Sequence, residues 1–264
     1  MEIKAAKKLK LTAGLVVLCC FIVASLVFYF VFGNPNNFLG GDIDNHPENL
    51  LGTIYKGGPI VVVLQALFLS VLVLSVERFF AIKKANGTGN LVKFVQGIKT
   101  SLEANNVEKA KQMCAEQKGS VANVVNSALI KYELMQKDTE LSKEQKLLTI
   151  QKEVEEATAL EMPSLEENLN FIATMTTLGT LLGLLGTVIG MIRSFAALAN
   201  AGAPDSIALA TGISEALINT AFGIATGATA VIAYSYFTGK IDKITYGIDE
   251  VGFSIVQSYS ATQK

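Results

Sequence analysis

Apolar residues are concentrated in four long stretches, which dominate the pattern along this 264-residue chain. The first three, residues 11–32, 57–76 and 169–192, contain no charged side chain, and the fourth, 206–239, contains one. A helix of about 20 apolar residues crosses a hydrocarbon core about 30 Å thick. The pattern therefore predicts an all-α, polytopic membrane protein with four transmembrane helices. We place these spans at about 11–32, 57–76, 169–199 and 206–238.

The chain between the second and third spans has a different pattern, in which charges are frequent and apolar residues recur every three or four positions. Such spacing is typical of amphipathic helices. We expect Asp138 or Thr139 to cap the last of these helices, and Pro163 to kink it or to mark where it meets the membrane. The segment 83–168 is therefore predicted to be helical and cytoplasmic. Its three apolar stripes are Leu91, Val95, Ile98 and Leu102; Val121, Val124, Val125, Ala128, Leu129, Tyr132 and Met135; and Leu147, Ile150, Val154 and Ala157.

Basic residues are distributed unequally among the connecting segments. Four lysines precede the first span, Arg78 and Lys83 follow the second, and the turn 200–205 has no Lys or Arg. The positive-inside rule then predicts that both termini are cytoplasmic and that the loop 33–56 is periplasmic. We expect the first span to be an uncleaved anchor, because its apolar core is too long for a signal peptide. The predicted parts are an N-terminal transmembrane hairpin (1–82), a cytoplasmic helical segment (83–168), and a second hairpin with a cytoplasmic tail (169–264).

The composition argues against an enzyme. Only 17% of residues are charged, and the chain has one histidine (His46) and no tryptophan. No nucleophile–base pair or metal cluster can be assembled from these residues. The glycine-rich run 183–190 lacks the Lys-Ser/Thr pair of a phosphate-binding loop and lies inside a span. We expect no metal, no cofactor and no nucleic-acid partner, and we interpret the three cysteines as small apolar residues.

Glycines recur at spacings of three or four residues in the third and fourth spans. Such spacing lets two helix backbones approach closely in a membrane. We therefore predict that these glycines pack the two spans together as an antiparallel hairpin. They are Gly179, Gly183, Gly186 and Gly190 in the third span, and Gly223 and Gly227 in the fourth.

Glu215 is the one charged residue of the fourth stretch. A carboxylate inside a membrane helix costs about 2.5–3.5 kcal/mol on insertion scales, so it usually faces a bundle interior or an ion path. Counted from a turn near Ala201, Thr187 and Glu215 lie at the same depth, about 21 Å along their helices. Asn219 lies one turn further in, and Thr220 is next to it. We predict that these four side chains line a proton path; the alternative is that they hydrogen-bond across helices as packing contacts.

At these residues the sequence resembles the ExbB/TolQ/MotA family of bacterial proton-channel subunits. The similarity is carried by Leu181–Ile192 with the following Phe195, by Gly212–Gly223, and by the pair Glu77-Arg78 at the end of the second span. The family commonly has Ala-Pro where this chain has Gly179-Thr180, and a proline where it has Thr229. The additional span 11–32 gives the four-span layout of MotA, whereas the motifs favour ExbB.

The resemblance implies a ring of five copies in the bacterial inner membrane, surrounding the membrane helices of an ExbD-like single-span subunit whose Asp carries the proton. A TonB-like transducer would then couple the proton motive force to outer-membrane transport. The resemblance also implies that Thr187 and Thr220 are lumen threonines and that Glu215 is the membrane glutamate of the family. We expect the third and fourth spans to line the lumen, the first span to face membrane lipid outside, and the cytoplasmic segment to form a vestibule. The alternatives are a TolQ- or MotA-like stator subunit, or a non-conducting membrane scaffold.

Overall fold

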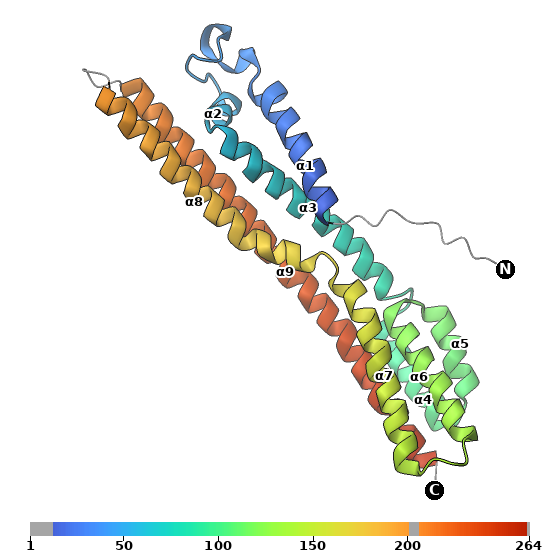
Figure 1. The fold of residues 1–264 in the computed structure, drawn as a ribbon. Coiled ribbons are helices and arrows are strands. Elements are labelled where there is room, and N and C mark those ends of the chain that lie inside the picture. Colours follow the sequence, from blue (N-terminus) through green and yellow to red (C-terminus); the bar gives the residue numbers. More distant parts are fainter. Residues whose placement is uncertain (1–12, 201–205, 263–264) are drawn as a thin grey trace, which may run out of the picture. The chain divides into compact units, whose positions relative to one another are not determined.

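The described residues of this computed structural model, 13–200 and 206–262, are almost entirely helical and contain no β-strand beyond one isolated bridge, Phe38 to Pro47 (Figure 1). Four helical stretches are long and apolar enough to cross a membrane: Ala13–Phe32, Pro59–Ala85, Leu169–Ala196 and Leu209–Thr262. The predicted all-α, polytopic membrane protein is confirmed. The chain folds into two compact units, and each unit combines segments that are distant in the sequence.

The first unit contains the described residues up to Val76 together with Asn168–Tyr234. Its helices are α1 (Ala13–Val27), which ends in a π-helical turn (Phe28–Phe32), α2 (Leu50–Lys56), the first part of α3 (Pro59–Ala85), α8 (Leu169–Asn200) and the first part of α9 (Ser206–Thr262). Between α1 and α2 lie two short 3₁₀ turns, Pro35–Asn37 and Leu39–Gly41.

Asn37 closes the end of the first span. Its amide donates to the carbonyls of Val31 (2.7 Å) and Phe32 (3.0 Å), which have no partner further along the helix. Asn49 in turn donates to the Asn37 side-chain oxygen at 2.9 Å and caps α2 through the Gly52 N–H. These amides order the connection to the second span.

The second unit contains Glu77–Glu167 and the chain from Ser235 onward. It is formed by the end of α3, by α4 (Leu91–Glu103), α5 (Val107–Gln117), α6 (Gly119–Lys137) and α7 (Lys143–Glu166), and by the end of α9. The first two predicted stripes are largely buried, whereas in the third only Ile150 is fully buried. Helix α5 was not predicted, because its few inward-facing residues, such as Ala110 and Cys114, form no long apolar stripe.

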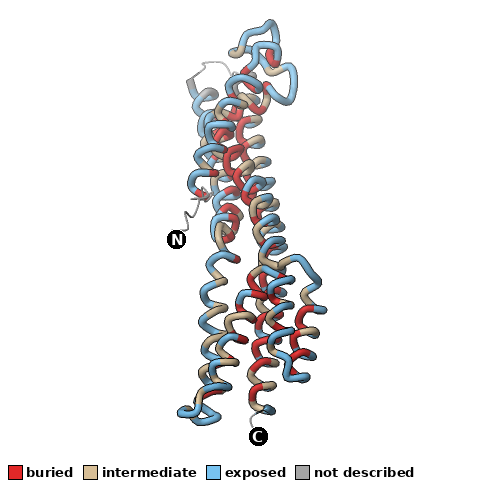
Figure 2. The backbone as a smooth tube through the Cα atoms, turned by 90° about the vertical axis from the view of Figure 1, so that its right-hand side faces the viewer, coloured by how far each residue is buried: buried red, intermediate tan, exposed pale blue. Residues whose placement is uncertain are grey.

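Helix α9 is longer than predicted, because it continues without a break from Ser206 to Thr262. No proline follows the predicted end of the span at residue 238, and apolar residues recur at helical spacing beyond it. Figure 2 shows buried positions alternating with exposed ones along this part of the chain. The buried residues there are Ile241, Ile244, Ile248, Val251, Ile255 and Tyr259.

Helix α7 begins one turn later than expected. Ser142, rather than Asp138 or Thr139, caps it in a reciprocal capping box with Gln145. Asp138 accepts the N–H groups of Glu140 and Leu141, and these hydrogen bonds lower the pKa of its carboxyl. The Asp138 side chain therefore orders the loop that precedes α7, and it does not cap the first turn of α7.

The end of α7 separates it from α8. Pro163 lies inside the last turn of α7, which ends at Glu166, and Asn168 has a left-handed φ of 63°. Asparagine tolerates this conformation better than most residues because its short side chain bonds locally. The amphipathic helix and the third span are therefore two helices.

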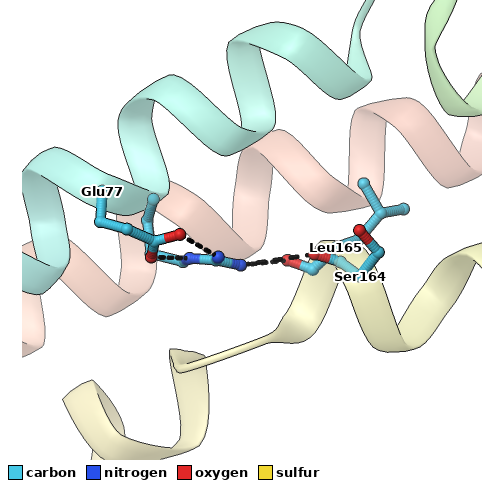
Figure 3. A network of polar contacts seen from close by, with 4 residues as sticks. Glu77, Ser164 and Leu165 are labelled. Atoms are coloured by element: carbon cyan, nitrogen blue, oxygen red, sulfur yellow. Dashed lines mark hydrogen bonds and ion pairs between the residues drawn. The ribbon is translucent and has the colours of Figure 1, made fainter. Parts of the chain in front are cut away.

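Arg78 is the most deeply buried charge of the second unit, with 1% of its surface exposed. Its guanidinium donates to both oxygens of Glu77, at 2.6 and 2.5 Å, and to the carbonyls of Ser164 and Leu165, at 3.4 Å each (Figure 3). The last carbonyls of a helix lack partners within it and attract a cation. Arg78 therefore joins the end of α3 to the end of α7.

We expect Arg78→Met to destabilise the second unit by about 1–3 kcal/mol, because it removes the Arg78 hydrogen bonds to two helix-end carbonyls and to the partly exposed Glu77 carboxylate. The measurement is thermal or denaturant unfolding of the purified chain in detergent. Lys84→Met is the matched control, since Lys84 is an exposed cation of the same helix. Equal destabilisation by both variants would contradict the role of Arg78.

We expect the thiol of Cys114 to be unreactive in the folded protein. Burial raises its pKa from 9.0 to about 12, so the reactive thiolate is depleted about a thousandfold relative to the unfolded chain. Maleimide labelling at pH 8, in a chain carrying Cys19→Ser and Cys20→Ser, should be slow in the native state and fast in denaturant. Because the thiol stays neutral only in the folded state, stability should also fall as the pH rises above 9. Rapid native labelling would show that α5 opens frequently.

Candidate functional site

Helices α8 and α9 lie side by side with their backbones in close contact (Figure 1). A Cβ atom on Gly183 would lie 2.9 Å from the Gly223 Cα atom, and one on Gly190 would lie 2.9 Å from the Ala216 Cβ atom. Such distances leave no room for a side chain. The six glycines named above, together with Gly212, all lie against the opposite helix.

The register of this hairpin differs from the one obtained by counting. Gly183 contacts Gly223, and the mean of these two residue numbers is 203, whereas the count was centred on Ala201; the turn itself lies outside the described residues. Thr187 accordingly lies opposite Thr220, and Glu215 lies five residues closer to the turn, about 7.5 Å along the helix. The expected equal depth of Thr187 and Glu215 was therefore wrong, because the centre of the turn cannot be located precisely from composition.

Thr187 and Thr220 form a hydroxyl pair across the hairpin. Their Oγ1 atoms are hydrogen-bonded to each other, and either one can be the donor. Each hydroxyl also lies within reach of a carbonyl of its own helix, that of Gly183 at 3.1 Å or Ala216 at 3.2 Å. A hydroxyl has one proton, so only one threonine at a time can donate to its carbonyl while the other donates across. The pair therefore has two alternative proton arrangements.

Glu215 is paired with Arg193 of α8. The carboxylate is buried, at 6% exposure, and its Oε1 atom accepts from Arg193 Nη1 at 2.5 Å. The Arg193 side chain is 54% exposed. On the other side lies Gly58, where a Cβ atom would approach Oε1 to 2.9 Å. The carboxylate is thus held between α8 and the turn that begins α3.

Sequence reasoning did not identify Arg193. One signal was present, because Arg193 is the sole basic residue between Leu169 and Gly239. It follows the charge-free part of the third stretch directly and was treated only as its boundary. Its guanidinium reaches back along the hairpin to a carboxylate 22 residues later in the sequence.

Asn219 is fully buried and joins α9 to the same turn. Its Nδ2 atom donates to the Gly57 carbonyl at 3.1 Å. Its Oδ1 atom is buried without a hydrogen-bond partner in the described part of the chain. Gly57 and Gly58 therefore meet both polar side chains of this α9 face, Asn219 and Glu215.

The predicted site residues thus form two groups. Glu215 and Asn219 meet the α2–α3 turn, whereas Thr187 and Thr220 contact each other across α8 and α9. Thr226 and Thr229 belong to neither group, since each donates to a carbonyl of its own helix at 2.8 Å. Within residues 13–200 and 206–262, no three His, Cys, Asp or Glu side chains cluster as metal ligands.

Part of this chain is similar to one family of known membrane proteins. Residues 121–250 match the model of the MotA/TolQ/ExbB proton channel family. A biopolymer transport protein ExbB homologue from Methanothermobacter thermautotrophicus is 26% identical over 200 residues, which cover 74% of this chain and 66% of that protein. The Tol-Pal system protein TolQ of Haemophilus influenzae is 39% identical over 94 residues, covering 34% of this chain and 41% of TolQ.

The biopolymer transport protein ExbB of Salmonella typhimurium is 30% identical over 86 residues, covering 33% of this chain and 35% of that protein. The matches thus span between about a third and two thirds of these relatives. The matched region includes α8, the first part of α9 and the polar side chains of the α8–α9 hairpin described in this subsection. Over residues 121–250, this multi-pass membrane protein is therefore similar to the MotA/TolQ/ExbB proton channel family.

Proposed function

We propose that this chain is the proton-channel subunit of an ExbB-type motor in the bacterial inner membrane. In this role it works as a homo-oligomeric ring, taken as five copies by analogy with the family. An ExbD-like single-span subunit and a TonB-like transducer are its partners, and both termini lie in the cytoplasm. The observation that carries the proposal is the buried Glu215, held by Arg193 beside the hydrogen-bonded threonine pair.

The Arg193 pairing limits what Glu215 does. The Arg193 guanidinium donates to the Glu215 Oε1 atom at 2.5 Å, so this oxygen is already engaged in an ion pair within the hairpin. Glu215 is the only carboxylate in those parts of the four described spans that lie within residues 13–76 or 169–234. The carboxylate that carries the transported proton is therefore supplied by the partner, and Glu215 sets the charge beside its path.

The threonine pair suits a relay. Because its two hydroxyls can exchange donor and acceptor roles, a proton or a water-borne hydrogen bond passes along the pair without movement of the backbone. Both hydroxyl groups lie on half-exposed residues, so a neighbouring chain or water can reach them.

A Tol-type stator is the second candidate. The chain is 39% identical to two TolQ proteins over about a third of its length, and 30% identical to the Salmonella ExbB over a similar length. The similarity to TolQ supports a TolQ-like role in envelope maintenance as the alternative. The two roles predict different losses when the site is changed, so the same variants distinguish them.

We expect Glu215→Gln to reduce proton-motive-force-dependent function at least about tenfold while leaving the oligomer intact. The amide keeps the shape but loses the charge facing the ion path, and about 1.4 kcal/mol suffices for a tenfold change in rate. Stability should change by less than about 1 kcal/mol, because the half-exposed Arg193 can turn to water. The readouts, in the host that encodes the chain, are TonB-type uptake, outer-membrane resistance to detergent, and native-gel assembly.

The control is the double variant Glu215→Gln with Arg193→Gln, which removes both charges together. If Glu215 serves only to neutralise Arg193, the double variant should recover function. If Glu215 sets the charge along the ion path, the double variant should stay inactive. Loss of uptake alone supports the ExbB-type role, and loss of detergent resistance alone supports the Tol-type role.

We expect Thr187→Val to reduce function by a similar factor without loss of assembly, because valine is nearly isosteric but cannot hydrogen-bond to Thr220. Thr229→Val is the matched control, since the Thr229 hydroxyl bonds only to the Ala225 carbonyl of its own helix at 2.8 Å. Both changes remove one hydroxyl from a half-buried position of the same hairpin. Equal activity of the two variants would assign Thr187 to packing.

A further inference from the structure

The second unit contains a groove of about 530 Å³ that the proposed ion path does not use. It is lined by the last turns of α3, the start of α4, and the stretch of α9 that follows Ser235. Close packing of α9 on α4 forms one of its walls, because a Cβ atom on Gly247 would lie 3.0 Å from the Leu91 Cδ2 atom.

The floor of the groove is apolar. Ile82, Val95, Phe237 and Ile244 line it and are each less than 7% exposed. Such a surface favours hydrocarbon over water, in proportion to the apolar area that is covered.

The rim is basic and aromatic. Lys83, Lys240 and Lys243 lie on it, and Glu250 is its one acidic residue, so the lining carries a net charge of about +2. Lys240 lies over the Tyr236 ring, with its Nζ atom 5.5 Å from the ring centre. This combination suits a ligand with an anionic head and an apolar tail.

The groove lies where the apolar runs of its helices end. On α3 its lining begins three residues after Val76, and on α9 it begins at Tyr236, three residues before the fourth apolar stretch ends at Gly239. Aromatic and basic side chains at the ends of membrane helices lie at the level of the lipid headgroups. The groove therefore opens where phospholipid phosphates are concentrated.

We propose that this groove binds an anionic phospholipid. The lysines hold its phosphate, and one acyl chain covers the apolar floor. Charge complementarity selects an anionic lipid over a zwitterionic one, and the floor selects a lipid over a free phosphate. The site is independent of the proposed channel function, so its test does not depend on transport.

The chain has no tryptophan, so a single introduced tryptophan reports on the groove. Val92 lines the groove and is 65% exposed, which makes Val92→Trp a suitable reporter. The full chain is placed in vesicles of mixed phosphatidylglycerol and phosphatidylcholine, in which only one of the two lipids carries brominated, quenching chains. We expect brominated phosphatidylglycerol to quench more strongly, with a relative binding constant at least about fivefold higher.

Two further reporters serve as references. Phe30→Trp, in the first span, should show no preference between the lipids, and Phe253→Trp, exposed on α9 outside the groove, should be quenched little by either. Changing Lys83, Lys240 and Lys243 together to Gln should abolish the preference, so that the two brominated lipids quench equally. Lys84→Gln should leave it unchanged, since Lys84 is exposed next to Lys83 but does not line the groove.

Native mass spectrometry of the unmodified chain provides a measurement that does not depend on the reporter. Retention of phosphatidylglycerol by the wild type, and its loss in the triple lysine variant, would support the site. Equal quenching by the two lipids, or an unchanged preference in the triple variant, would overturn it. Relief of the quenching by millimolar glycerol phosphate would assign the groove to a soluble anion instead.

Discussion

Contact between the backbones of α8 and α9 is the constraint on which the polar site depends. Gly183 and Gly223 leave space for no side chain between the helices, and this fixes the register of the hairpin. The register in turn places Thr187 against Thr220 and brings Arg193 within 2.5 Å of Glu215. In a membrane such contact rests on dispersion and polar pairing, because lipid offers no hydrophobic driving force between helices. A shift of one turn would separate every one of these pairs.

Buried charge is handled in the same way in both units. Glu215 has Arg193 as its partner, and Arg78 has Glu77 together with two carbonyls at the end of α7. In each case the charge joins two different helices, α8 to α9 or α3 to α7. A buried charge without a partner is so costly that these pairs specify the arrangement of the helices, even where their net contribution to stability is small.

Much of the architecture was readable in advance. The four spans follow from the length of the apolar stretches, and α4 and α6 follow from stripes that are largely buried in the structure. Local competition limited the rest: Ser142 took the capping position because Gln145 could complete the capping box. Helix α5 was missed because an amphipathic period is weak when a helix turns only a few small residues inward.

The sequence by itself determined the class of the protein, its spans, the residues that carry the family resemblance, and the unusual carboxylate at Glu215. These properties depend on composition and local spacing, which an isolated chain already possesses. Only the tertiary structure decided the register of the hairpin, the pairing of Arg193 with Glu215, the bond from Asn219 to Gly57, and the basic groove beside α9. Each of these joins residues at least 22 positions apart, and their relative depth depends on turn geometry and close packing that no local pattern encodes.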